Sequence, residues 1–188
     1  IIELILSLSV LVALSVISGF IDNRYHRSSL IGVMLQGVLF GLTAIVGMLY
    51  PFVLTEGIIF DGRSIVVSLS TLFFGPITGL IASIIAITYR ISLGGVGALT
   101  GSLVVASSYI IGLIFFQRRK QNAAKILSKL ELYIFGIVVH ISMMTLMIIL
   151  PSKNLPEVYK TITLTVLGIY PLITLIIGKI LLDQEENQ

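Results

Sequence analysis

The sequence predicts an all-α polytopic membrane helix bundle. Hydrophobic residues make up 56% of the 188 residues, charged residues make up only 11%, and the mean hydropathy is +1.09. A soluble domain carries about 25% charged residues. Several windows approach or exceed the ~18 apolar residues that span a bilayer. Helices are expected because they satisfy their own backbone hydrogen bonds in lipid, and the sequence lacks the alternating ten-residue pattern of an outer-membrane barrel.

About seven apolar segments of unequal length follow one another along the chain. Their expected ranges are 4–20, 30–50, 63–74, 77–89, 96–116, 132–150 and 161–182. The first lacks the charged start and the small-residue cleavage site of a signal peptide, so we expect it to be a membrane helix. The chain starts without Met, and its last segment has no terminating cap. We therefore expect residues 1–188 to form one transmembrane domain, with a cytoplasmic effector domain following it.

Lysines and arginines predict how the bundle is oriented. The loop after the first segment contains Arg24 and Arg27, and the stretch 117-QRRKQNAAKILSKLE-131 follows the fifth. These two basic loops lie on the same side if every segment crosses. Because positive loops stay inside, we expect them and the C-terminus in the cytoplasm and the N-terminus outside. The net charge of +3 is therefore no sign of nucleic-acid binding.

The segments 63–74 and 77–89 are too short to cross a membrane. Twelve or thirteen residues at 1.5 Å rise cover about 18–20 Å, against a hydrocarbon core of ~30 Å. With Gly75-Pro76 turning at the cytoplasmic face, the other ends lie roughly 10 Å below the outer surface. The flanking stretches 52-FVLTEGIIFDG-62 and 91-ISLGGVGALTG-101 look irregular. Irregular backbone at that depth is tolerated where it lines a wet cavity, so we expect the floor of a pocket open to the outside.

Two arginines are the principal candidates for ligand binding in this pocket. The hairpin brings Arg63 and Arg90 to the same depth, where each costs about 2.5–3.5 kcal/mol to insert, so both need counter-charge. Asp61 neutralises one of them, and Glu56 is a further candidate. The remaining guanidinium suits a carboxylate or phosphate, which it binds in bidentate geometry. In the alternative interpretation, Asp61 and Arg63 cap a helix while Arg90 extends to the interface.

Small and polar residues complete the prediction. Glycines 94, 95 and 97 let backbone N–H groups approach an anion closely. The pairs 37/41, 75/79 and 97/101 have the spacing of close helix packing. Ser68, Ser70 and Thr71 bond backbone carbonyls or reach the pocket. His140 is expected to make an interhelical hydrogen bond or to act as a proton sensor, and Pro171 to kink the last helix.

The sequence predicts no catalytic residues, no metal site and no cofactor. It has no cysteine, which excludes disulfides, thiolate metal sites and a catalytic thiol. No Ser/His/Asp grouping, Walker loop or acidic metal cluster is present.

The run 60-FDGRSIVVSLSTLFFGPITGLIASIIAITYRISLGGVGALTG-101 resembles the core of the LytS–YhcK-type five-transmembrane sensor domain. That family has D/N-x-R opening a short helix, a G-P turn, then Y/H-R followed by L-x-G-G. The matching positions here are Asp61, Arg63, Gly75, Pro76, Tyr89, Arg90, Gly94 and Gly95. Asp61, and Tyr89 before Arg90, are closer to the branch that precedes diguanylate cyclases than to the histidine-kinase branch.

The resemblance implies an input module of bacterial signalling proteins in the inner membrane. Such a module binds a small anionic ligand, with pyruvate-like carboxylates as examples, and signals to a diguanylate cyclase or histidine kinase, working in lipid as a homodimer. The full-length protein would then be the enzyme, and this fragment would not. The expected ligand-binding residues are Asp61, Arg63, Ser64, Tyr89, Arg90, Gly94 and Gly95.

Two other classes of function stay open. The span arrangement of the family is also similar to that of the vitamin-binding membrane subunits of energy-coupling-factor transporters, so the alternative is a substrate-binding transport subunit. A membrane anchor that only dimerises an effector is the third possibility, and it predicts that no small molecule binds.

Overall fold

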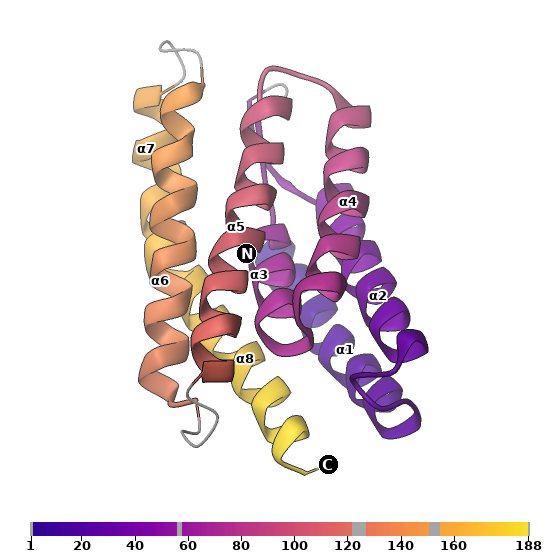
Figure 1. Ribbon diagram of the computed structural model, residues 1–188. Coiled ribbons are helices and arrows are strands. Elements are labelled where there is room, and N and C mark those ends of the chain that lie inside the picture. Colours follow the sequence, from indigo (N-terminus) through magenta and orange to yellow (C-terminus); the bar gives the residue numbers. More distant parts are fainter. Residues whose placement is uncertain (1, 56–57, 122–126, 151–154, 188) are drawn as a thin grey trace.

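The computed structural model describes residues 2–55, 58–121, 127–150 and 155–187. Helices make up almost all of this part of the chain (Figure 1). The α-helices are α1 (Ile2–Arg24), α2 (Leu30–Leu49), α3 (Arg63–Phe74), α4 (Pro76–Leu93), α5 (Ala98–Gln121), α6 (Lys129–Leu146), α7 (Leu155–Leu164) and α8 (Tyr170–Glu186). A 3-10 turn, Met147–Ile149, extends α6, and a π-helical turn, Thr165–Ile169, joins α7 to α8.

Five helices among the described residues are long and apolar enough to cross a membrane. They are Leu30–Leu49, Pro76–Leu93, Ala98–Gln121, Lys129–Ile149 and Val158–Glu186. Large apolar side chains such as Leu30, Ile84 and Leu164 are exposed on the outside of the bundle, where lipid rather than water is the expected solvent. The predicted polytopic helix bundle is confirmed, and the protein is a multi-pass membrane protein.

The short helix α3 forms the centre of the bundle. All twelve of its residues are buried, and it packs against α2, α4, α5, α6 and α8. Its hydroxyl side chains bond carbonyls of their own helix: Ser68 donates to Ile65, and both Ser70 and Thr71 donate to Val67. Of the two roles considered for these hydroxyls, the structure shows backbone bonding.

Small residues bring the helices of the bundle close together, as their spacing predicts. A Cβ on Gly37 or Gly41 would lie 2.8 Å from Ile81 and 2.7 Å from Ile85, respectively, so α2 approaches α4 at these glycines. A Cβ on Gly79 would collide with Thr71 of α3. These contacts fix α3 and α4 side by side, and hence the positions of the arginines they carry.

The structure corrects the predicted hairpin of two short arms. α3 has the predicted bounds and is short, but α4 continues to Leu93 and is long enough to span. The apolar run stops at Arg90, yet this side chain is turned into the bundle and is 2% exposed. The helix therefore does not need to end there.

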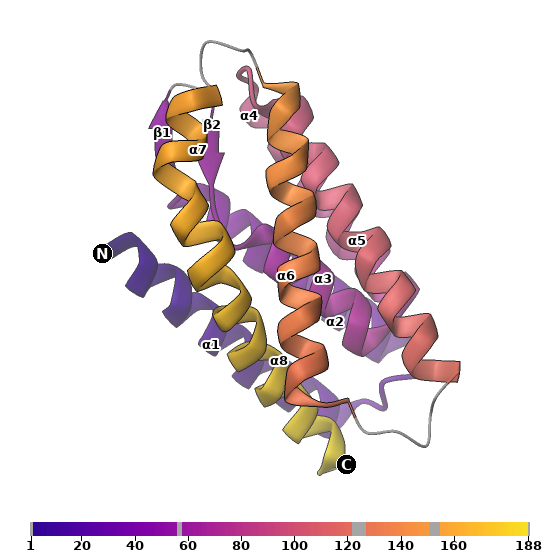
Figure 2. The ribbon, with the colours of Figure 1, turned by 90° about the vertical axis from the view of Figure 1, so that its left-hand side faces the viewer.

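The stretch before α3 is more regular than the sequence suggests. β1 (Phe52–Thr55) and β2 (Ile58–Phe60) form an antiparallel hairpin with Phe52 opposite Phe60. Figure 2 shows this hairpin at the same end of the bundle as the start of α7 and the turn between α4 and α5. It adds a small two-stranded element to an otherwise helical fold.

The described residues of the two basic loops lie at one end of the bundle, as predicted. Arg27, after α1, and Arg119, near the end of α5, both form ion pairs with Glu185 in the last turn of α8. Figure 2 shows the ends of α1, α5 and α8 at the end of the molecule opposite the β-hairpin. The loops and the C-terminal end of α8 therefore share a side.

Candidate ligand site

Arg63 and Arg90 lie together although they are on different helices. Arg63 is the first residue of α3, Arg90 is in the last turn of α4, and their exposed fractions are only 5% and 2%. Both reach Gly101 of α5, where a Cβ would lie 2.8 Å from Arg90 Nε and 3.3 Å from Arg63 Nη2. A Cβ at that point would press on both guanidinium groups, so Gly101 provides the room in which they meet.

Asp61 provides the carboxylate of this cluster. Its Oδ2 lies 3.5 Å from Arg63 Nη1, and its Oδ1 accepts the backbone N–H of Arg63 at 2.9 Å. The second contact ties Asp61 to the first residue of α3, as the alternative interpretation expects, although the N-cap residue is Gly62 and no side-chain cap bond forms there. Arg90, however, does not extend to the interface as that interpretation requires, because it is enclosed by protein.

Backbone carbonyls accept hydrogen bonds from both guanidinium groups. Arg63 Nη2 donates to Ile59 O of β2 at 3.2 Å, and Arg90 Nη1 donates to Gly94 O at 2.8 Å. The segments on either side of the α3–α4 pair therefore fold over the arginines. We name Asp61, Arg63 and Arg90, with these two carbonyls, the Arg63 cluster.

The other predicted site residues differ in how they relate to this cluster. Gly94 and Gly95 adopt positive φ angles of 66° and 82°, which favour glycine. The Gly94 N–H donates to Ile91 O, so in this structure Gly94 offers the arginine its carbonyl. Tyr89 is half-buried against the hydrophobic core. Glu56, the second expected counter-charge, lies outside the described residues.

Ser64 connects the Arg63 cluster to a histidine that the predicted ligand set does not contain. His140 of α6 is fully buried, and its Nε2 lies 3.3 Å from Ser64 Oγ. Its Nδ1 is 2.6 Å from Gly136 O, which can only accept, so Nδ1 carries the proton and Nε2 accepts from Ser64. The ring also meets Tyr170 edge-on at 5.4 Å. The interhelical hydrogen bond expected for His140 is confirmed. Its partner could not be read from the sequence, since the two residues are 76 positions apart.

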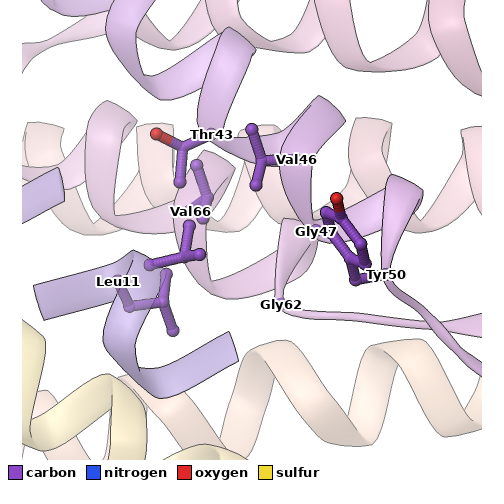
Figure 3. A pocket seen from close by; sticks show the side chains of 8 residues that line it. Leu11, Thr43, Val46, Gly47, Tyr50, Gly62 and Val66 are labelled. Carbon is purple, nitrogen blue, oxygen red and sulfur yellow. The ribbon is translucent and has the colours of Figure 1, made fainter. Parts of the chain in front are cut away.

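A small cavity lies near Asp61. It has a volume of about 20 Å³ and is lined by Leu11 of α1, Thr43 and Gly47 of α2, and Gly62 and Val66 around the start of α3 (Figure 3). A Cβ on Gly47 would touch Asp61 at 3.7 Å. This space holds about one water molecule. The two arginines do not line it, and the pocket expected from the sequence stays a prediction.

Pro171 lies where the last membrane segment is irregular. The π-helical turn Thr165–Ile169 comes directly before α8, in which Pro171 is the second residue. Proline lacks the N–H that a continuous helix needs, and π-turns often mark such breaks. A Cβ on Gly136 would be 3.1 Å from Pro171 Cα. The irregular part of the last segment therefore packs on the helix that carries His140.

The comparisons with known proteins agree with this architecture. No curated protein and no solved structure matches the chain. A family model described as "5TMR of 5TMR-LYT" matches residues 14–184, which include the entire Arg63 cluster, His140 and Pro171. Such a domain is a non-catalytic transmembrane sensing module. The match extends over most of the chain and agrees with the resemblance found in residues 60–101. The chain therefore belongs to the LytS–YhcK-type five-transmembrane sensor domains, the 5TMR of 5TMR-LYT family.

Proposed function

We propose that this sensing module binds a small carboxylate-type anion from outside the cell at Arg63 and Arg90. The observation that carries the proposal is the placement of two guanidinium groups beside Gly101, deep in a membrane bundle, with Asp61 against one of them. A guanidinium offers a planar pair of donors that matches a carboxylate, and its charge attracts an anion strongly where water is excluded. Neither property is needed for helix packing alone.

The carbonyls of Ile59 and Gly94 suggest how an anion is admitted. In this structure the two carbonyl oxygens accept hydrogen bonds from the arginines. A bound carboxylate would accept these hydrogen bonds instead. A carboxylate adds to the hydrogen bond with a guanidinium the attraction between opposite charges, which a neutral carbonyl lacks. Exchange of carbonyl for carboxylate therefore releases β2 and the turn after α4 from the arginines, and binding is accompanied by movement of these segments.

The signal passes to a cytoplasmic diguanylate cyclase or histidine kinase, and the domain works as a homodimer in the bacterial inner membrane. The shared side of the basic loops and the end of α8 supports a cytoplasmic C-terminus. Effectors of both kinds act in pairs, which is the reason for proposing a dimer. A strictly monomeric protein in bilayers would contradict dimerisation by this domain.

A thermal-shift screen tests the ligand proposal. Acetate, pyruvate and inorganic phosphate are added to the purified protein at fixed detergent, with chloride as the ionic-strength control. We expect one of these anions to raise the melting temperature of the wild type. Arg63→Ala and Arg90→Ala should abolish the shift, because a hydrogen bond to a charged group contributes about 1.5–3 kcal/mol, or roughly ten- to a hundredfold in affinity. Arg63→Lys and Arg90→Lys should also weaken it, since lysine keeps the charge without the planar fork.

Arg24→Ala is the matched control. It removes an arginine from the exposed last turn of α1 and should leave the shift unchanged. An anion-induced shift that survives in both Arg63→Ala and Arg90→Ala would show that these arginines are structural and that the ligand binds elsewhere.

A further inference from the structure

A second group of charges surrounds the opposite end of α3. Glu185, in the last turn of α8, directs its two carboxylate oxygens to two different arginines. Oε1 lies 3.5 Å from Arg27 Nη1, and Oε2 accepts a hydrogen bond from Arg119 Nη2 at 2.5 Å. Arg27 follows α1 and Arg119 belongs to α5, so one carboxylate joins three parts of the bundle. We name Glu185, Arg27 and Arg119 the Glu185 clamp.

Both arginines of the clamp also rest on α3. The guanidinium of Arg27 lies 4.6 Å from the centre of the Phe74 ring, and that of Arg119 lies 5.3 Å from the centre of the Phe73 ring. These rings are the last two residues of α3 and are almost fully buried. Cation–π contacts at such distances are attractive, and they set where the guanidinium groups sit.

Asp22 holds Arg27 in this position. Its Oδ2 accepts hydrogen bonds from Arg27 Nε at 2.8 Å and from Nη2 at 2.6 Å, while Gln36 of α2 donates to Oδ1 at 2.9 Å. Arg27 is therefore held by Asp22 of α1 and by the Phe74 ring of α3, and Gln36 of α2 holds Asp22 in turn. Glu185 binds to a preorganised cation, so its position follows the elements that hold that cation.

Charged groups thus lie at both ends of α3. Arg63 is its first residue, Phe73 and Phe74 are its last, and the helix between them is about 18 Å long and wholly buried. Because the helix is short and enclosed, we expect it to move as one body. A displacement at the Arg63 end would then shift the rings beneath Arg27 and Arg119.

We propose that the Glu185 clamp fixes the end of α8 to the Phe74 end of α3, so that the position of α3 sets the position of the α8 end. The clamp lies apart from the anion site and needs no ligand to be tested. Its failure leaves the anion proposal intact, and failure of anion binding leaves the clamp intact.

Distance measurement between two spin labels tests the clamp. The chain has no cysteine, so labels attach only at introduced positions. Ile77, exposed in the first turn of α4, and Asn187, exposed after α8, are changed to cysteine and the protein is placed in lipid nanodiscs. Glu185→Gln should broaden the distance distribution between the labels, whereas the control Glu186→Gln, an exposed acid one position further, should keep it.

The link to α3 is tested by Phe73→Leu together with Phe74→Leu. This change keeps apolar side chains in place but removes both rings under the arginines, so it should also broaden the distribution. A distribution unchanged in Glu185→Gln would overturn the clamp. Broadening in Glu185→Gln alone, with the leucine variant identical to the wild type, would overturn the link to α3.

A measurement on the labelled protein with an unchanged Glu185 clamp guards against misfolded variants. Raising NaCl to 1 M shortens the screening length to about 3 Å and weakens partly exposed ion pairs. The wild-type distribution should broaden under these conditions, and a distribution that does not respond would contradict the clamp.

Discussion

Ionic groups of the same chemistry lie at the two ends of α3, in different surroundings. In the Arg63 cluster the side chains of Arg63 and Asp61 are 5% and 0% exposed, whereas in the Glu185 clamp those of Arg119 and Glu185 are 22% and 32% exposed. Enclosed charges depend on one another because no water replaces a missing partner. Partly exposed charges are solvated and screened, so each contributes little. The Arg63 cluster is therefore suited to holding an ion, whereas the ion pairs of the Glu185 clamp can be broken at a small cost in free energy.

Removal of Asp61 should have the largest effect. Asp61→Asn removes the carboxylate that pairs with Arg63, and breaking a buried ion pair costs about 3–5 kcal/mol. We expect a large fall in the melting temperature of the ligand-free protein in detergent. Asp183→Asn, which removes a partly exposed carboxylate of α8, should change it little. Equal melting temperatures of the two variants would mean that the Arg63 cluster is no more sensitive to the loss of a carboxylate than the partly exposed end of α8.

Filling the space at Gly101 should have the second largest effect on stability. A Cβ there would lie 2.8 Å from Arg90 Nε, so Gly101→Ala pushes a buried guanidinium away from its acceptors. Overpacking of this kind costs about 1–3 kcal/mol. Gly168→Ala is the control, because its nearest neighbour is the Leu164 side chain at 3.8 Å. Thermal unfolding of both variants measures the difference, and a Gly101→Ala variant as stable as the control would show that the guanidinium groups are free to shift.

Both ends of α3 itself could be predicted from the sequence, but most of what surrounds them could not. A charged residue at Arg63 and the Gly75-Pro76 turn delimit the helix by local rules. The direction of Arg90 depends on Gly101, which lies in another helix and makes room for the side chain only after the bundle has packed. The contact of Ser64 with His140 has the same origin, since it joins helices that meet through tertiary packing.

The Ser64–His140 hydrogen bond should contribute an energy between that of the Arg63 cluster and that of the Arg119–Glu185 pair. It is buried and neutral, and such interhelical bonds in membrane proteins contribute about 0.6 kcal/mol on average and about 1.7 at most. A double-mutant cycle of Ser64→Ala and His140→Ala, followed by unfolding in detergent, should give a coupling energy in this range. A coupling close to zero would mean that α3 and α6 are held together by apolar packing without this bond.

The Arg119–Glu185 pair should give the smallest energy and the clearest response to salt. A double-mutant cycle of Arg119→Gln and Glu185→Gln should yield about 0.2–1 kcal/mol at low ionic strength, because both side chains are partly solvated. The coupling should decrease as NaCl is raised, since the screening length falls from about 10 Å at 0.1 M to about 3 Å at 1 M. The stability cost of Asp61→Asn should stay constant over the same range, because protein excludes salt ions from the Arg63 cluster.

If the Arg119–Glu185 coupling energy and the cost of Asp61→Asn responded equally to salt, the Arg63 cluster would be open to ions, and the distinction between the two ends of α3 would be wrong. A constant Asp61→Asn cost would instead mean that an anion reaches Arg63 and Arg90 only when the covering segments move.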